Sequence, residues 1–332
     1  MSQLAKKEKN VKNIDSKFQI IEVPSKGQGM KQYKKLTLLE LIVVAFISVI
    51  FLVILWPVHG QIKKVNSRIF CQSNLKGLGS AMSEYVNDFD GQYPQLPGNG
   101  PWSKELGFSY DLTSPDFAGE QAHTPRTITA SWYLLVRHSD MALNVFVCPE
   151  SNQKDFDNKI PDDFNIYELW DFGADPYSYV SYSMHNPYGK YPANKNHPPN
   201  FAVAADMSPW FKDGNILEVN ENKDLPPQII DLKNTEIWNK GNSINHTEST
   251  TKLFFLKYTK KHKYGIGQNV LYIDGHVNFE NTANCGINND NIYTFWSTEA
   301  NPSEQDIQGG SAPTDRSPKN DAKSEEDSFL VI

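Results

Sequence analysis

Residues 36–58 read LTLLELIVVAFISVIFLVILWPV, and this stretch decides the fold. From residue 41 to residue 56 it carries no charge, and Ser48 is its one polar side chain. An apolar helix of ~20 residues is long enough to cross the ~30 Å hydrocarbon core of a bilayer. The alternative, a helix buried in a soluble core, is rarely so long and so free of charge. We therefore expect a single transmembrane helix over residues 36–58, since no later segment is comparably long and apolar.

The charge of the chain changes sharply at this stretch. Residues 1–35 hold nine Lys and three acidic residues, a net charge of 9 − 3 = +6, and because the 332 residues sum to −7 the remainder carries −7 − 6 = −13. Basic flanks stay on the cytoplasmic side of a membrane. We expect residues 1–35 to be a basic cytoplasmic leader and the acidic body to lie across a single-pass inner membrane anchor. The acidic balance also excludes a general nucleic-acid binder.

Glu40 is the one carboxylate inside the apolar stretch. A carboxylate near the start of a membrane helix is costly and is retained where it has a partner; alternatively, Glu40 reaches the basic interface. Residues 35–44, KLTLLELIVV, resemble the N-terminal motif of type IV prepilins and of the pseudopilins of type II secretion. Pro57, seventeen residues after Glu40, resembles the kink of the pilin helix.

This resemblance implies processing and assembly. A membrane prepilin peptidase would cut between Lys35 and Leu36 and methylate the new amine, and Glu40 would pair with the amine of a neighbouring pilin-type subunit. The protein would then be a structural subunit of a type II secretion or type IV pilus-like apparatus, not an enzyme. Lys35 stands where the family has Gly or Ala. It favours the alternative, an uncleaved surface-anchored protein that binds glycan or another envelope polymer.

Beyond Pro57 the pattern becomes amphipathic. Apolar side chains recur at steps of three and four, which predicts a stem helix over residues 59–90 with one face against a globular head. The Asp90-Gly91 pair and Pro94 should end it. The predicted stripe consists of Ile62, Val65, Ile69, Leu75, Leu78, Met82, Tyr85 and Val86.

Short segments farther along resemble a large planctomycete-type group of prepilin-like proteins. In chain order they are CQSNLKGLG (71–79), YVNDFDGQYP (85–94), VFVCP (145–149), SYSMH (181–185), AVAAD (202–206), SINH (243–246) and GQNVLYIDGHV (267–277). The group carries a His separated by nine residues from an Asp-Gly pair. Here twenty-seven residues separate His246 from Asp274, so we expect an insertion of 27 − 9 = 18 residues after His246.

Asp274 and Gly275 stand between two β-prone runs. Such a pair predicts a two-residue type I′ hairpin turn, with positive φ at both positions, followed by His276. The insertion, with five Lys interleaved among four aromatic residues from 252 to 264, is favoured as a solvated hairpin whose Lys protect an exposed edge. The alternative is a surface for an anionic polymer or partner.

The candidate sites are few. The sequence contains no nucleophile-elbow, P-loop or dinucleotide-binding motif, so no catalytic residue is assigned; a hydrolase would have to draw on Asp206, Asp274 and His246. The His spacings predict no metal site, although His246, Asp274 and His276 could converge. Calcium is the one cofactor considered, at residues 87–91 (NDFDG) and 288–291 (NNDN), where turns and caps serve as well. Of three Cys, the favoured disulfide joins Cys71 to Cys148, with Cys285 able to replace either.

The final residues differ from the rest. Residues 297–332 are polar and acidic and predict a disordered tail, whose apolar tip (FLVI) either docks on a partner, docks on its own head, or frays. The whole therefore predicts an α+β protein: a long N-terminal pilin-like helix packed on a globular head, residues 91–296, with an antiparallel sheet.

Overall fold

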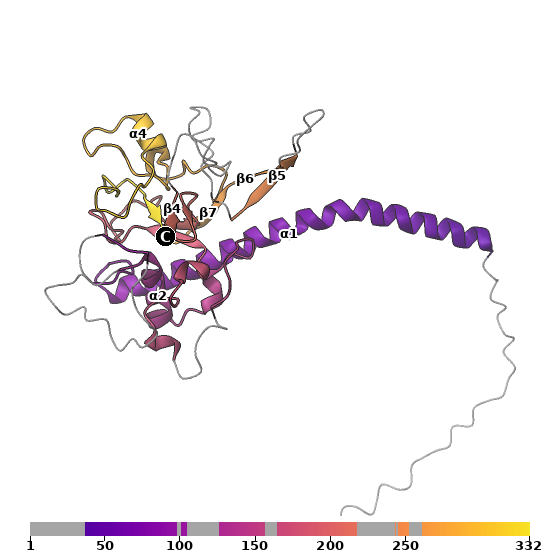
Figure 1. Cartoon of the computed structure of the whole chain (residues 1–332), viewed down its shortest axis with the longest axis horizontal. Coiled ribbons are helices and arrows are strands. Elements are labelled where there is room, and N and C mark those ends of the chain that lie inside the picture. Colours follow the sequence, from indigo (N-terminus) through magenta and orange to yellow (C-terminus); the bar gives the residue numbers. More distant parts are fainter. Residues whose placement is uncertain are drawn as a thin grey trace, which may run out of the picture. The chain divides into compact units, whose positions relative to one another are not determined.

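The structure, a computed structural model, describes residues 37–97, 101–104, 126–156, 165–217, 243, 245–251 and 261–332; the side chains of residues 53–65 and 247–265 are not described. The predicted leader and the cut between Lys35 and Leu36 lie outside the described residues. The chain divides between Trp56 and Pro57 into two units, which are treated separately below. Its longest element, helix α1 (Leu38–Asp88), belongs to both (Figure 1).

The N-terminal unit contributes the first part of α1. Thr37 and Glu40 form a capping pair: Glu40 Oε2 accepts from the Thr37 backbone N (2.8 Å), and Thr37 Oγ1 accepts from Glu40 N (3.3 Å). This reciprocal arrangement satisfies two amide groups that the first turn leaves free. From Leu38 to Leu52 the large apolar side chains are exposed on all sides of the helix.

Among the described residues, none of the helices combines the length and the apolarity needed to cross a membrane. The predicted transmembrane segment, residues 36–58, lies partly outside this description, which includes neither Leu36 nor the side chains of residues 53–58. The helix is continuous through Pro57, and the kink expected there stays a prediction.

In the second unit, the last part of α1 packs on the head. The predicted stripe is confirmed from Leu75 to Val86, whose apolar members are buried. The inclusion of Ile69 in this stripe was wrong, because its side chain is 57% exposed. The buried face of the helix passes through Cys71 instead. Gly79 brings the helix close to strand β7: a Cβ built there would lie 2.6 Å from Leu271 Cδ1. The helix ends at Asp88, and Gly91 with φ +86° turns the chain away, as the Asp90-Gly91 pair predicted.

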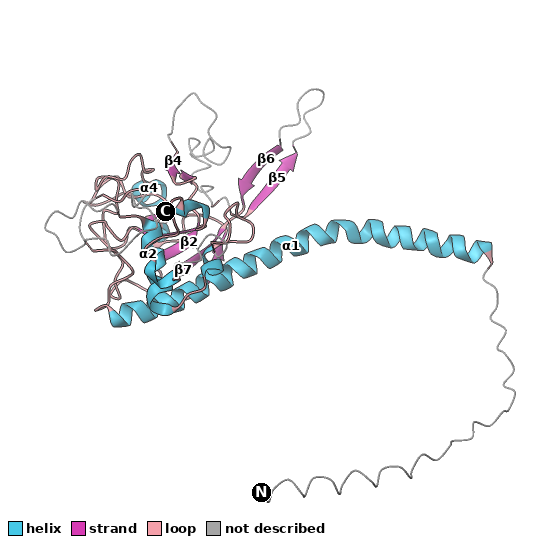
Figure 2. Cartoon of the chain, turned by 60° about the horizontal axis from the view of Figure 1, so that its bottom comes forward, coloured by secondary structure: helices cyan, strands magenta, loops and turns pink. Residues whose placement is uncertain are grey.

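The head is built on a five-stranded antiparallel sheet in the order β8-β7-β2-β1-β9. Helices pack against this sheet, which confirms the coarse expectation of an α+β fold. Figure 2 shows β2 and β7 beside the end of α1. The strands of this sheet are β1 (Tyr182–His185), β2 (Ala202–Asp206), β7 (Gln268–Tyr272), β8 (Val277–Glu280) and β9 (Leu330–Val331).

The remaining elements are short. Helix α2 (Ile128–Ser139) starts at Thr127, whose side chain accepts from Ala130 N. Two further two-stranded sheets pair β3 with β4 and β5 with β6. The other elements are β3 (Phe211–Lys212), β4 (Asn215–Ile216), β5 (Thr247–Thr251), β6 (Lys261–Gly265), α4 (Glu304–Gly309) and the 3-10 turns η1 (Leu143–Phe146), η3 (Ile166–Glu168), η4 (Pro176–Ser178) and η7 (Ile287–Asn289).

The prediction of a disordered tail over residues 297–332 is wrong. The structure describes this segment throughout, its last four side chains are buried, and β9 pairs with β1 as the edge strand of the main sheet. The physical reason is that Asp327, which composition counts as a solubilising charge, is buried and accepts hydrogen bonds from the backbone N of Trp296 (3.0 Å) and of Lys323 (2.7 Å). The apolar tip therefore docks on its own head, and the head extends to residue 332.

The hairpin between β7 and β8 has a different turn from the one predicted. Tyr272 N donates to His276 O (3.0 Å) and Gly275 N donates to Tyr272 O (2.8 Å), so the loop has three residues. Only Gly275 takes a positive φ, +83°, as in the turn-plus-bulge hairpins of this length. Ile273 N donates to Phe201 O (2.9 Å), which extends the antiparallel pairing of β7 with β2 by one residue.

The insertion after His246 contains the hairpin that was favoured for it. Strands β5 and β6 pair from Thr247 opposite Gly265 to Thr251 opposite Lys261. They form a ribbon separate from the main sheet (Figure 2). The connecting residues 252–260 lie outside the described part of the chain.

Candidate functional site

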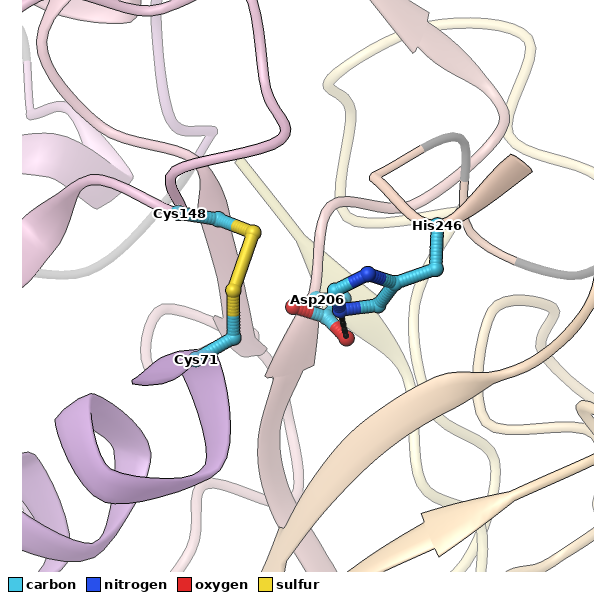
Figure 3. A group of neighbouring side chains, drawn as sticks. All are labelled: Cys71, Cys148, Asp206 and His246. Atoms are coloured by element: carbon cyan, nitrogen blue, oxygen red, sulfur yellow. Dashed lines mark ion pairs between the residues drawn. A yellow bond between two sulfur atoms is a disulfide. The ribbon is translucent and has the colours of Figure 1, made fainter. Parts of the chain in front are cut away.

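Four side chains from distant parts of the sequence meet in the head. Cys71, Cys148, Asp206 and His246 each offer one ligand atom within 4.8 Å of the others, and all four are buried. Figure 3 shows the two Cys joined in a disulfide, with the Asp206 carboxylate and the His246 ring facing each other beside it. Cys71 and Cys148 make the disulfide that the sequence favoured.

Each member is held by a different element. Cys71 lies on the buried face of α1. Cys148 lies two residues after η1, and its backbone N donates to Ser181 Oγ (2.5 Å). Asp206 is the last residue of β2, and His246 comes directly before β5. The helix, the central strand of the sheet and the base of the hairpin ribbon therefore converge on one point.

His246 lies between two carboxylates. Its Nδ1 is 3.0 Å from Glu150 Oε2, and its Nε2 is 3.3 Å from Asp206 Oδ2. Burial disfavours the charged ring and lowers its pKa, but the hydrogen bonds and negative charges of Asp206 and Glu150 outweigh burial, so the pKa of His246 lies above its ordinary value. In the neutral ring, a proton on Nδ1 bonded to Glu150 leaves the lone pair of Nε2 facing the interior of the group.

Asp206 is held by amide groups. Its Oδ2 accepts from Asn269 N (2.6 Å) and from Asn269 Nδ2 (3.1 Å), and its Oδ1 accepts from Asn245 Nδ2 (3.3 Å). Asn269 Nδ2 also lies 3.1 Å from His246 Nε2. Asn269 Oδ1, in contrast, is buried and has no hydrogen-bond partner among the described residues. The network is thus well supported around the carboxylate but leaves one buried acceptor unsatisfied, which is costly.

The arrangement allows two kinds of chemistry. In the disulfide state, the group cross-links the stem helix to the head beside a buried His–Asp ion pair. With the sulfurs as thiolates, it would present two sulfurs, an imidazole and a carboxylate, a donor set that zinc accepts. Acid–base chemistry on a substrate would require the site to open, because Asp206 and His246 are fully buried and only Glu150 is partly exposed.

Other residues singled out from the sequence do not join this group. Asp274 and His276 lie at the opposite end of β7 from Asn269, where His276 N donates to Asp274 Oδ1 (3.0 Å) in the exposed turn around Gly275. The sequence left open a convergence of His246, Asp274 and His276, and the structure does not bring these three residues into one group. Cys285 is a free cysteine.

The two stretches considered for calcium lie in different surroundings. Asp290 is buried and accepts from Trp296 Nε1 (2.8 Å) and from Ser328 N (2.8 Å), so its oxygens hold the C-terminal segment. Asp88 and Asp90 are exposed at the end of α1.

Glu150 and Asn269 were missed by sequence reasoning. Glu150 stands two residues after Cys148, and Asn269 is the second residue of β7, within the segment GQNVLYIDGHV. A weak signal existed for both residues. Glu150 is close to Cys148 in the sequence, and Asn269 lies in a strand-forming run that could pair with the run ending at Asp206. Neither residue type at that spacing is specific enough to predict a contact with His246.

A separate groove lies beside the end of α1. It has a volume of about 530 Å³, within the usual range of ligand sites. Tyr85 and Phe89 stack at its wall with ring centroids 4.0 Å apart, and His138 meets both rings edge-on. Tyr93, Trp170 and Tyr188 contribute further aromatic surface.

Compared with models of protein families, with curated protein sequences and with solved structures, the chain matches none of them.

Proposed function

We propose that the chain is a membrane-anchored structural subunit of the pilin or pseudopilin kind, which serves a type II secretion or type IV pilus-like apparatus of the cell envelope. The observation that carries the proposal is the first part of α1. There the apolar side chains are exposed on every side of the helix, and a single carboxylate, Glu40, lies in the first turn. A helix that is apolar all round belongs in an apolar environment, such as a bilayer or the centre of a fibre.

Glu40 supports the proposal because of what its carboxylate needs. In the single chain it bonds with the neighbouring Thr37, through the backbone N (2.8 Å) and Oγ1 (3.0 Å). Inside a membrane or a bundle of such helices, a carboxylate is retained where a charged partner neutralises it. In an assembly of like or related subunits, the processed amine of the next chain would supply this positive charge.

The far part of α1 supports a structural role in a different way. The stem is fixed on the head at two levels: the disulfide joins Cys71 to Cys148 in the segment after η1, and Gly79 closely approaches Leu271 of β7. A subunit that is pulled or pushed through its anchor helix needs such a rigid connection to its head.

The proposal includes a location and partners. The anchor would cross the inner membrane once, with the basic leader in the cytoplasm and the head on the periplasmic or extracellular side. A prepilin peptidase would process and methylate the chain after Lys35. Nucleic acid has no place in this function.

The proposal is tested on protein extracted from its native membrane, by intact mass, N-terminal sequencing and cross-linking of neighbouring subunits. A mature chain that begins at Leu36 with a methylated amine is expected. Glu40→Gln, which removes only the charge, should reduce cross-linked multimers at least tenfold, because a buried positive charge would lose its partner. Glu84→Gln, an exposed Glu on the same helix, is the matched control and should assemble normally.

Thr37→Val separates assembly from helix capping. It removes the side-chain cap, worth about 1 kcal/mol, but keeps the Glu40 charge, so multimers should persist. A chain that still begins at Met1, together with assembly that does not respond to Glu40→Gln, would refute the pilin function. It would favour the alternative of an uncleaved anchored protein that binds an envelope polymer, for which the aromatic groove offers a surface.

A further inference from the structure

We propose that Cys71, Cys148, Asp206 and His246 form a zinc site when the disulfide is reduced, so that one position in the head holds either a cross-link or a metal ion. This inference does not rest on the proposed structural function. It rests on the four buried ligand atoms within 4.8 Å of one another, and on the residues that surround them.

The distances suit a tetrahedral ion. Zinc binds thiolate sulfur at about 2.3 Å and imidazole or carboxylate atoms at about 2.0–2.2 Å, so its ligands lie roughly 3.3 to 3.8 Å apart. His246 Nε2 and Asp206 Oδ2 are already separated by 3.3 Å. The Cα atoms of Cys71 and Cys148 are 5.2 Å apart. Once the disulfide is broken, rotation of these two side chains is therefore enough to bring the two sulfurs to a similar spacing.

The surrounding residues resemble the outer shell of a metal centre. A metal-bound His usually gives its other ring N–H to a carboxylate or carbonyl, which fixes the ring and leaves one nitrogen for the metal. Here Glu150 Oε2 lies 3.0 Å from His246 Nδ1, and the other ring nitrogen, Nε2, faces the Asp206 carboxylate (Figure 3). Asn269 and Asn245 orient the Asp206 carboxylate in the same manner.

One buried acceptor beside the group, Asn269 Oδ1, also lacks a hydrogen-bond partner among the described residues. It belongs to the side chain whose Nδ2 bonds both Asp206 and His246. Unsatisfied buried polar atoms are rare in native structures and often mark a functional site or an unseen ion or water.

The redox step balances with a dithiol as the reductant. The dithiol gives two electrons to the bond between the Cys71 and Cys148 sulfurs and becomes a disulfide itself, while each released sulfur takes up a proton. Zinc then displaces both thiol protons and binds the two thiolates, the neutral His246 ring and the Asp206 carboxylate. In the reverse step a small-molecule disulfide accepts two electrons and, with two protons from solvent, becomes a dithiol, while the Cys71 and Cys148 sulfurs re-form their bond and release the zinc ion.

The experiment measures zinc bound by the full chain in detergent, after removal of excess metal, with and without a dithiol. One equivalent is expected in the reduced chain and none in the oxidised chain, and cobalt should show a thiolate charge-transfer band. His246→Gln and Asp206→Asn should weaken zinc binding more than 100-fold, and Glu150→Gln by about 10- to 100-fold. The matched controls are His276→Gln, Asp274→Asn and Cys285→Ser, which should bind normally.

The control variants also distinguish zinc binding by the folded site from zinc binding by a head that reduction has unfolded. An unfolded chain would bind zinc through any thiol, so Cys285→Ser would then weaken binding and His246→Gln would not. That result would overturn the proposal, as would a reduced, folded chain without zinc. Alkylation followed by mass spectrometry is a second readout, since zinc should protect Cys71 and Cys148 while leaving the reactivity of Cys285 unchanged.

Discussion

Asp171 shows at the residue scale how burial and hydrogen bonding compete. Its Oδ2 accepts from Thr127 Oγ1 (2.5 Å) and from Thr129 Oγ1 (2.9 Å), and its Oδ1 accepts from Phe172 N (2.8 Å), so it fastens the start of α2. Burial raises the pKa of Asp171 to about 7, against the lowering effect of these hydrogen bonds. The folded head therefore takes up a proton here at a pH where the unfolded chain does not.

This raised pKa predicts how stability depends on pH. Between the ordinary Asp pKa and about 7, the folded state binds more protons at Asp171 than the unfolded state, so its contribution to the free energy of unfolding falls as pH rises, by at most about 1.4 kcal/mol per pH unit. In urea unfolding, wild type should gain stability relative to Asp171→Asn on going from pH 7.5 to 5. Asp306→Asn is the control, because Ser303 lowers the pKa of Asp306 and moves its titration below this window. A gap between wild type and Asp171→Asn that stays constant with pH would contradict the prediction.

At the scale of elements, the contact between α1 and β7 depends on the absence of a side chain. Leu271 occupies the space over Gly79, with Cδ1 2.6 Å and Cδ2 3.2 Å from the position of a Cβ. Glycine inside a helix costs about 1 kcal/mol relative to alanine. Its presence here indicates that close packing outweighs this cost, and Leu271 is fully buried and cannot easily move away.

Gly79→Ala should therefore lower the free energy of unfolding by about 1–2 kcal/mol, since overpacking costs about 1–3 kcal/mol and exceeds the gain in helix propensity. Gly77→Ala is a matched control on the same helix, where a Cβ would meet Met141 Cε at an ordinary 3.8 Å. It should stabilise the head by up to about 1 kcal/mol. Equal effects of the two substitutions would show that Gly79 is not needed for helix–strand packing. Adding Leu271→Ala to Gly79→Ala should give a favourable coupling energy.

At the scale of the whole head, the disulfide joins elements that are 77 residues apart in the sequence. Closing a loop of that length restricts the unfolded chain and stabilises the folded state by about 4 kcal/mol in the entropy model. The cross-link also attaches the stem helix to the segment after η1, beside the ion pair of His246 and Asp206.

Replacing both Cys71 and Cys148 with Ala should reduce the free energy of unfolding of the head by about 4 kcal/mol, measured by denaturant unfolding under oxidising conditions. Cys285→Ser should change it much less, because Cys285 forms no cross-link. In wild type, a reductant without zinc should reproduce the loss, whereas a reductant with zinc should restore part of it. Unfolding curves that do not respond to the double substitution would show that contacts, not the cross-link, hold the stem.

Local patterns explain which predictions succeeded. The buried face of α1 from Leu75 to Val86 follows from the helical period, and the end of the helix follows from Asp90 and Gly91. The hairpin of β7 and β8 was predicted from the Asp-Gly pair, but its turn was not. The bond from Ile273 N to Phe201 O, which extends the pairing of β7 with β2 into this turn, involves another part of the chain.

The candidate site could be predicted only in pieces. Cys71, Cys148, Asp206 and His246 each lay in a segment noted from the sequence, yet no spacing joined all four, because they come from α1, the segment after η1, the end of β2 and the residue before β5. Glu150 completes the group through a contact across 96 residues. Pairings at such separations are decided by the tertiary fold.

The sequence by itself determined the local properties of this protein: a long apolar helix with a carboxylate at its start, an amphipathic continuation and the strand-forming runs, since all of these depend on composition and period. Only the tertiary structure decided the fate of the acidic C-terminal segment and of the buried cysteine–histidine–aspartate group. Composition counts Asp327 and Asp206 as solvated charges, but the folded chain gives both of them amide donors in the interior. Burial of a carboxylate is tolerated only where such donors offset its desolvation cost, and the position of the donors is a property of the whole fold.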